Sequence, residues 1–200
     1  AMIKLEKNGT VALFLGSPNG GQGHETTTAQ VAADVLGISP DRISVTTPFD
    51  SDLAPWGVSA ANSGNNFHLY DIGAIQGAAI KLREKILTLA ANILIAAPAE
   101  LTIENGVVVA SSSPIKKISL ADLGKLAYSN QSVMPPGFEG GLRTTFYYTF
   151  PHAQPYLTPG LDRKVRAQFT FSAGAHAAVV EVDKDTGKVD VLRYVIVCDN

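Results

Sequence analysis

The chain has 200 residues, of which 46% are hydrophobic and 17% charged, and its formal net charge is -2. This balance is typical of a globular protein and excludes intrinsic disorder, while the weak negative charge argues against nucleic acid as a partner. The length fits a domain with a substantial core. We expect residues 2–200 to form a single domain that is part of a larger subunit or complex.

The distribution of charges and cysteine indicates the compartment. Lys81 and Arg83 interrupt the longest apolar stretch, so the sequence predicts no membrane span. Lys4 and Glu6 argue against a secretory signal at the start. The single cysteine, Cys198, excludes an internal disulfide and fits a reducing compartment, so we expect a cytoplasmic protein.

The pattern of apolar, glycine and β-branched residues predicts strands and helices without a regular alternation. In chain order we expect a strand at 11–15, a helix at 25–36, a strand at 42–47, a helix at 71–95, strands at 101–103 and 107–109, a helix at 119–128, and strands at 144–150, 177–182 and 189–197. Asn105-Gly106 predicts a tight hairpin turn, and Ser119 is a typical helix cap. The fold class is therefore α+β, with mixed sheets and a long amphipathic helix.

The long helix over residues 71–95 is the clearest element. Its apolar side chains recur three and four residues apart, which places them in one stripe. They are Ile72, Ile75, Ala79, Leu82, Ile86, Leu89 and Ile93. Gly73 and Gly77 leave the first turns thin, so we expect another segment to approach the backbone there.

The last strand is apolar enough to predict a buried position, particularly over residues 192–198. The sequence given stops at Asn200, barely past this strand, and a domain rarely ends there. We therefore expect further protein beyond this strand, in the same gene or in a partner.

A Gly-rich loop over residues 16–23 separates the first predicted strand from the first predicted helix. A loop at a helix start presents backbone N–H groups and a positive dipole end, which favour an anion. A phosphate-binding P-loop is disfavoured because Gln22 replaces its lysine and Gly23 its hydroxyl residue. A dinucleotide fingerprint is disfavoured because Thr26 replaces the third small residue. A third interpretation remains open, in which the glycines serve only the geometry of the backbone turn.

The residues that follow carry a family resemblance. The segment Gly21-Gln22-Gly23-His24-Glu25-Thr26 resembles the Gly-Gln-Gly-His-Glu-Thr segment of molybdenum hydroxylase large subunits. That family includes xanthine dehydrogenase, aldehyde oxidase and aerobic carbon monoxide dehydrogenase. Residues 135–139 and 174–183 are similar to later segments of the family, in the same order. The resemblance covers nearly the whole chain and implies a molybdopterin-binding domain of molybdenum hydroxylase type.

The resemblance also implies the residues of the site. In the family the Gly-rich loop wraps the pterin, and a second loop grips the phosphate of the cofactor. On this match the cofactor-binding residues are Gly21, Gln22, Gly23 and His24 in the first loop, and Asn62, Ser63, Gly64 and Asn65 in the second. Gly64 and Asn65 depart from the arginine and serine that are frequent in the family. The family's glutamate base lies in a segment that this sequence lacks, so we expect no catalytic residue and no metal ligand in this chain.

The implied activity is the hydroxylation of an aldehyde or N-heterocycle with water as the oxygen source. The implied cofactor is molybdenum–molybdopterin, in its plain or cytosine dinucleotide form, with iron–sulfur clusters and FAD on partner domains or subunits. The implied partners are the remainder of the molybdopterin subunit, iron–sulfur and flavin subunits, and a small-molecule substrate. We expect the isolated chain to be inactive. The alternative is a cofactor-free structural or binding module that retains the fold.

Overall fold

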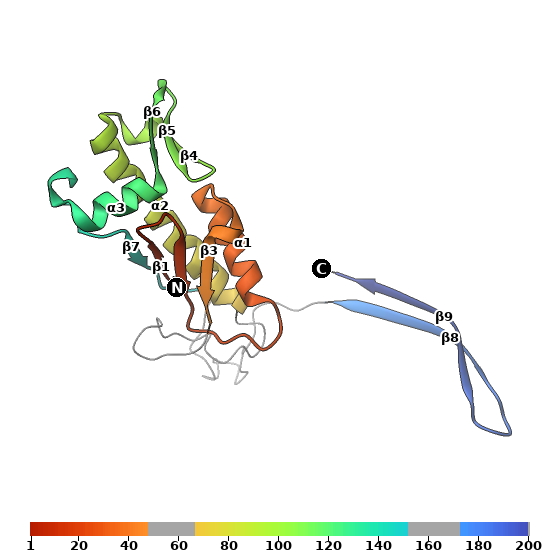
Figure 1. Cartoon of the computed structure of the whole chain (residues 1–200). Helices are drawn as coiled ribbons and strands as arrows, with labels where there is room; N and C mark the ends of the chain where they lie inside the picture. Colours follow the sequence, from red (N-terminus) through yellow and green to blue (C-terminus); the bar gives the residue numbers. More distant parts are fainter. Residues whose placement is uncertain (48–66, 152–172, 200) are drawn as a thin grey trace. The chain divides into compact units, whose positions relative to one another are not determined.

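The structure is a computed structural model that describes residues 1–47, 67–151 and 173–199. The chain divides into two compact units, Ala1–Pro151 and His152–Asn200 (Figure 1). Each is described by itself below. The single domain expected over residues 2–200 stays a prediction.

The first unit is built on a four-stranded sheet with the strand order β3-β2-β1-β7. The strands are β1 (Met2–Leu5), β2 (Val11–Phe14), β3 (Ile43–Thr46) and β7 (Arg143–Thr145). β1 pairs antiparallel with β2 and β7, and β2 pairs parallel with β3. The sequence analysis missed β1, a short strand in which buried Ile3 and Leu5 alternate with half-buried residues.

Two helices pack beside one another against this sheet (Figure 1). Helix α1 (His24–Leu36) connects the parallel strands β2 and β3, confirms the predicted first helix and ends at Gly37, whose backbone is left-handed. Helix α2 (Ile72–Leu94) confirms the long amphipathic helix, and its apolar stripe includes the fully buried Leu82 and Ile86. A turn of π-helix, Phe67–Asp71, leads directly into α2 and was not predicted.

The thin start of α2 is approached by the segment that follows β7. A Cβ atom added at Gly73 would lie 2.5 Å from the ring of Tyr148, and one at Gly77 would lie 2.4 Å from the ring of Phe146. The predicted close approach is therefore confirmed. The predicted strand over 144–150 is wrong beyond Thr145, because the ladder with β1 runs out where Ala1 and Phe146 exchange backbone hydrogen bonds of 2.9 Å.

A three-stranded antiparallel sheet completes the first unit. It consists of β4 (Leu101–Glu104), β5 (Val107–Ala110) and β6 (Ser113–Ser119), followed by α3 (Leu120–Ser129). Single turns of 3-10 helix occupy Pro40–Arg42, Pro98–Glu100 and Gln131–Val133. Asn105 and Gly106 both have positive φ, as the hairpin signal requires. Ser119 accepts a hydrogen bond of 3.0 Å from the backbone of Asp122, which confirms the predicted cap.

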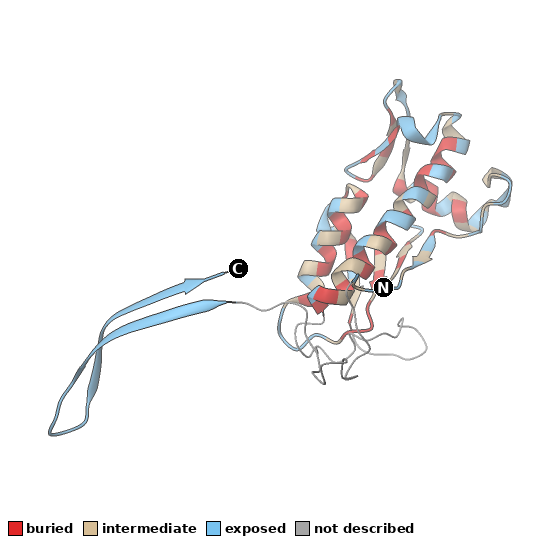
Figure 2. Cartoon of the chain, turned by 180° about the vertical axis from the view of Figure 1, so that it is seen from behind, coloured by how far each residue is buried: buried red, intermediate tan, exposed pale blue. Residues whose placement is uncertain are grey.

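The two sheets and the three α-helices described for this unit contribute to one hydrophobic core. Buried residues run along the inner sides of the helices (Figure 2). The mixed helices and sheets confirm the α+β class.

The second unit contains the hairpin of β8 (Gly174–Val182) and β9 (Val189–Cys198), as predicted. The strands pair antiparallel, with an irregularity of register between Val179 and Val180. Every residue of both strands is exposed (Figure 2). Residues 192–198, which the sequence predicts to be buried, are exposed in this hairpin, because two strands alone cannot cover their own faces.

Candidate cofactor-binding site

The Gly-rich loop lies at the edge of the four-stranded sheet where β2 and β3 both end. Because these strands are parallel, the residues that follow Phe14 and Thr46 leave the sheet on the same side. Helix α1 begins at this edge, immediately after the loop (Figure 1). The fold thus combines a strand end, a Gly-rich turn and a helix N-terminus, which is a favourable place for a polar or anionic ligand.

Two predicted site residues, Gly21 and Gly23, have backbones that favour glycine. Their φ angles are 102° and 75°. A Cβ atom added at either position would meet nothing within 4 Å, so both face open space. Gly23 is also the N-terminal cap of α1, and no side chain caps this helix start. The open cradle and uncapped helix start fit a bound group that approaches the backbone closely.

The loop is held in shape by hydrogen bonds from its own side chains. Asn19 Oδ1 accepts from the backbone N–H groups of Gly21 and Gln22 at 3.0 and 3.1 Å. Gln22 Oε1 accepts from the backbone N–H of Gly20 at 2.7 Å. The oxygen of the Gln22 carboxamide is therefore used within the loop, and its NH2 end is the part that can donate to a ligand.

Glu25, in the first turn of α1, ties the loop to the end of β3. Its carboxylate accepts hydrogen bonds from Asn19 Nδ2 and, at 2.8 Å, from Thr47 Oγ1. The sequence analysis did not assign Asn19, Glu25 or Thr47 to the site. An acidic residue in a first helical turn is a familiar signal. Its two partners come from separate segments that only the parallel strand pair brings together.

His24 lies beneath the loop. Its ring is 4% exposed and stacks on Phe67 with centroids 3.8 Å apart and planes inclined by 7°. Thr28, one helical turn later, is fully buried. Among the residues that the structure describes, His24 Nδ1 and Thr28 Oγ1 make no hydrogen bond. Buried polar atoms are rarely left so, since each costs about 1–3 kcal/mol.

The structure describes the residues on both sides of the second predicted loop. Asn62, Ser63, Gly64 and Asn65 lie outside the described residues. Thr47 and Phe67, on either side of the range 48–66, both contact the first turn of α1, the one through Glu25 and the other through His24. The structure thus brings Gly21, Gln22, Gly23 and His24 together and does not test the other four.

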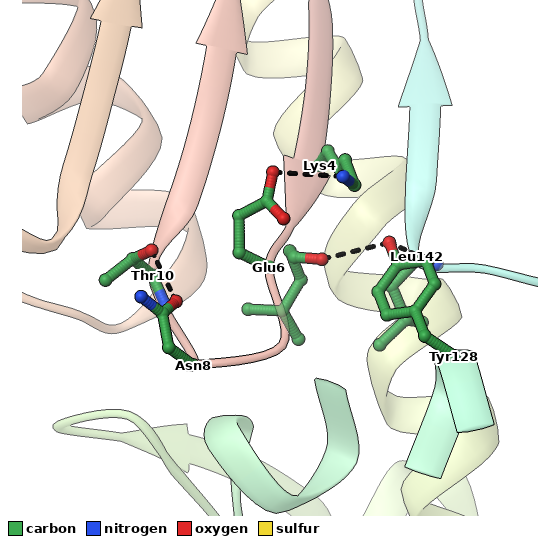
Figure 3. Close-up of polar contacts among 7 residues, drawn as sticks. Lys4, Glu6, Asn8, Thr10, Tyr128 and Leu142 are labelled. Atoms are coloured by element: carbon green, nitrogen blue, oxygen red, sulfur yellow. Dashed lines mark hydrogen bonds and ion pairs between the residues drawn. The ribbon is translucent and has the colours of Figure 1, made fainter. Parts of the chain in front are cut away.

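A second polar cluster lies at the opposite edge of the sheet (Figure 3). The Tyr128 hydroxyl donates to the carbonyl of Leu5 at 3.0 Å and accepts from the backbone N–H of Leu142 at 3.2 Å. Burial raises the pKa of Tyr128 above its ordinary value. Nearby, Lys4 and Glu6 form an ion pair of 3.0 Å. These contacts join α3 to β1 and the start of β7, and they serve the fold.

The described ranges contain neither a cluster of metal ligands nor a helix suited to a membrane. In residues 1–47, 67–151 and 173–199, no three His, Cys, Asp or Glu side chains gather in a way that could hold a metal ion. Over the same ranges, no helix is both long and apolar enough to cross a membrane.

The whole chain matches one family model. The model of the molybdopterin cofactor-binding domain matches residues 1–200, and the chain belongs to this family. The resemblance to molybdenum hydroxylase large subunits is thereby confirmed.

Individual proteins agree with the family model. The nicotine 6-hydroxylase large subunit of Paenarthrobacter nicotinovorans is 32% identical over 200 residues, which are 100% of this chain and 22% of that protein. The carbon monoxide dehydrogenase large chain of Afipia carboxidovorans is 28% identical over 194 residues, or 97% and 21% of the two chains. The crystal structure of quinoline 2-oxidoreductase from Pseudomonas putida 86 superposes with a TM-score of 0.75 at 28% identity, covering 98% of this chain and 22% of that one. The chain thus spans about a fifth of the length of these relatives.

Proposed function

We propose that this chain is the molybdopterin-binding portion of a molybdenum-dependent hydroxylase that oxidises an N-heterocycle or an aldehyde with water as the oxygen source. The observation that carries the proposal is the open cradle at Gly21 and Gly23, set at an uncapped helix start within a chain of the molybdopterin-binding family. Two of the similar proteins are named for nicotine and quinoline, which are N-heterocycles. These names favour an N-heterocycle over an aldehyde.

The proposed roles follow from the contacts of each residue. Gly21 and Gly23 let the backbone of the loop approach the cofactor closely, because neither carries a side chain into the open space. Gln22 donates from its NH2 end, because its oxygen is held by Gly20. His24 is buried on Phe67 and positions the loop from beneath. Asn62, Ser63, Gly64 and Asn65 would complete the site from the second loop, and the contacts of both its flanks with α1 support this.

The chain binds and orients the cofactor and contributes no catalytic base. When bound, molybdenum–molybdopterin supplies the oxidation–reduction chemistry. We propose the cytosine dinucleotide form, whose added phosphate suits the positive end of α1. Iron–sulfur clusters and FAD would reside on partner domains or subunits of a cytoplasmic complex. The isolated chain would be inactive, because the relatives extend well beyond the part it matches.

The test compares two glycines with nearly the same positive φ angle. Gly23 and Gly137 have φ angles of 75° and 76°, and a Cβ at either meets nothing within 4 Å. Alanine therefore strains both alike, but only at Gly23 does the new methyl group enter the cradle. In the assembled complex we expect Gly23→Ala to lower the pterin and molybdenum content about tenfold, equivalent to about 1.4 kcal/mol. Gly137→Ala should retain both.

The alternative of a cofactor-free module makes the opposite prediction. Gly64 and Asn65, which depart from the family pattern, favour it. An intact complex without pterin, or equal cofactor content in the Gly23→Ala and Gly137→Ala variants, would decide for this alternative.

A further inference from the structure

Glu25 uses both oxygens of its carboxylate on segments other than its own helix. An acidic side chain in a first helical turn commonly stabilises the start of that helix. In α1 the start has no side-chain cap, and the Glu25 carboxylate instead accepts from Asn19 Nδ2 and, at 2.8 Å, from Thr47 Oγ1. Glu25 therefore joins the Gly-rich loop to the residue that follows β3.

Asn19 extends this connection to the backbone of the loop. Its Nδ2 donates to Glu25, while its Oδ1 accepts from the backbone N–H groups of Gly21 and Gln22 at 3.0 and 3.1 Å. Both ends of the carboxamide are used, so its partners fix its orientation. An aspartate could accept from the loop but could not donate to Glu25. The asparagine thus links the first turn of α1 to two of the predicted cofactor-binding residues.

The two ends of this connection differ in burial. Thr47 is 7% exposed and Glu25 is half-buried, so this end is anchored in the fold. Asn19 and the two loop residues that it holds are exposed. Hydrogen bonds between exposed groups add little to the stability of folding, because water readily replaces either partner. The exposed end therefore contributes more to the shape that the loop presents to a ligand than to the stability of the fold.

We propose that Glu25 and Asn19 are a positioning pair that sets the shape of the Gly-rich loop for the molybdopterin cofactor. The pair holds the loop backbone against α1, so that Gly21 and Gly23 keep the open space in which an added Cβ meets nothing within 4 Å. Both residues act through the loop and not by touching the cofactor. This inference rests on the proposed function and adds two residues to it.

The first variant, Asn19→Asp, removes the donor and keeps the acceptor. The new carboxylate faces that of Glu25, and like charges this close repel one another. The experiment uses the intact molybdopterin-binding subunit from the native host and measures the pterin retained per subunit after gel filtration. We expect Asn19→Asp to lower it at least about fivefold. The midpoint of thermal unfolding should change by less than about 2 °C, because the substituted side chain is exposed.

The second variant exchanges the two functional groups. Asn19→Asp combined with Glu25→Gln places the carboxylate in the loop and the carboxamide on α1. The NH2 end of the carboxamide can donate to the carboxylate, and its oxygen can accept from the Thr47 hydroxyl. The net charge of the pair equals that of the wild type. We expect the exchange to restore pterin retention to within about twofold of the wild type.

Two single variants complete the set. Glu25→Ala removes both contacts of the carboxylate and should lower pterin retention as much as Asn19→Asp. Asn8→Asp is the matched control, because Asn8 is also exposed and followed by glycine but lies before β2, at the end of that strand away from the Gly-rich loop. Its Oδ1 accepts from the backbone N–H and the hydroxyl of Thr10 at 3.0 and 2.6 Å, which a carboxylate does equally well. Asn8→Asp should retain the pterin.

The exchange distinguishes a positioning pair from a direct effect of charge on the cofactor. If it fails to restore the pterin, the charge at residue 19 itself repels the cofactor and the inference is overturned. Full pterin retention in Asn19→Asp, or an equal loss in Asn8→Asp, would overturn it as well, in a subunit whose wild type contains pterin. A wild-type subunit without pterin would instead remove the proposed function, and this inference with it.

Discussion

The Ala1–Pro151 unit and the β8–β9 hairpin are both rich in apolar residues, yet they use them differently. In the first unit, side chains such as Ile75, Leu82 and Leu123 are fully buried in one core. In the hairpin, Val191 and Val197 are 61% and 66% exposed. The difference shows that an apolar pattern indicates that a side chain will be buried, but not whether its cover comes from the same chain.

The largest effect is expected when one apolar side chain is removed from each of the two regions. Leu82→Ala leaves a cavity in the core and should lower the free energy of unfolding of the isolated chain by about 3 kcal/mol. Val191→Ala, in the exposed hairpin, should change it by less than about 0.5 kcal/mol. Urea unfolding of both variants provides the measurement, and equal losses would mean that the hairpin has a cover within the chain.

The next largest effect is expected where the ring of Phe146 approaches helix α2 closely. Gly77→Val would force the ring of Phe146 away from the helix and should cost about 2 kcal/mol. Gly140→Val is the control, because a Cβ there meets nothing within 4 Å and its φ is not positive. Thermal unfolding of the two variants should separate them. Equal midpoints would contradict the packing of Phe146 on α2.

The smallest expected effect concerns the hydroxyl that joins α3 to the sheet. Tyr128→Phe breaks the hydrogen bonds to Leu5 and Leu142 and should cost about 1 kcal/mol. Tyr147→Phe, at a residue that is 66% exposed, should be neutral. A loss of stability at Tyr147 as large as that at Tyr128 would show that the effect does not come from these two bonds.

Local patterns predicted α1, α2, the Asn105–Gly106 turn and the glycine backbone of the loop, because each depends on neighbouring residues. Strand β1 was missed because four residues, one of them Lys4, carry too short an alternation. Which distant segments contact one another could not be predicted, and the link of Glu25 to Thr47, 22 residues away, is an example.

The wrong part of the strand over 144–150 has a related cause. Its alternating aromatic residues do have a buried side, but Phe146 and Tyr148 lie on the glycines of α2. The pattern indicated burial correctly and could not show which element would provide it. The same limit applies to residues 192–198, whose pattern predicts burial and which are exposed in the described hairpin.

Molybdenum and pterin content tests the central claim most directly, namely that this chain binds the cofactor as part of a larger subunit. The measurement compares the complex that copurifies with the chain from its native host with the isolated chain. Equimolar molybdenum and pterin in the complex, and neither in the isolated chain, is the predicted result. An intact complex without molybdenum, or an isolated chain that retains equimolar molybdenum, would contradict the account.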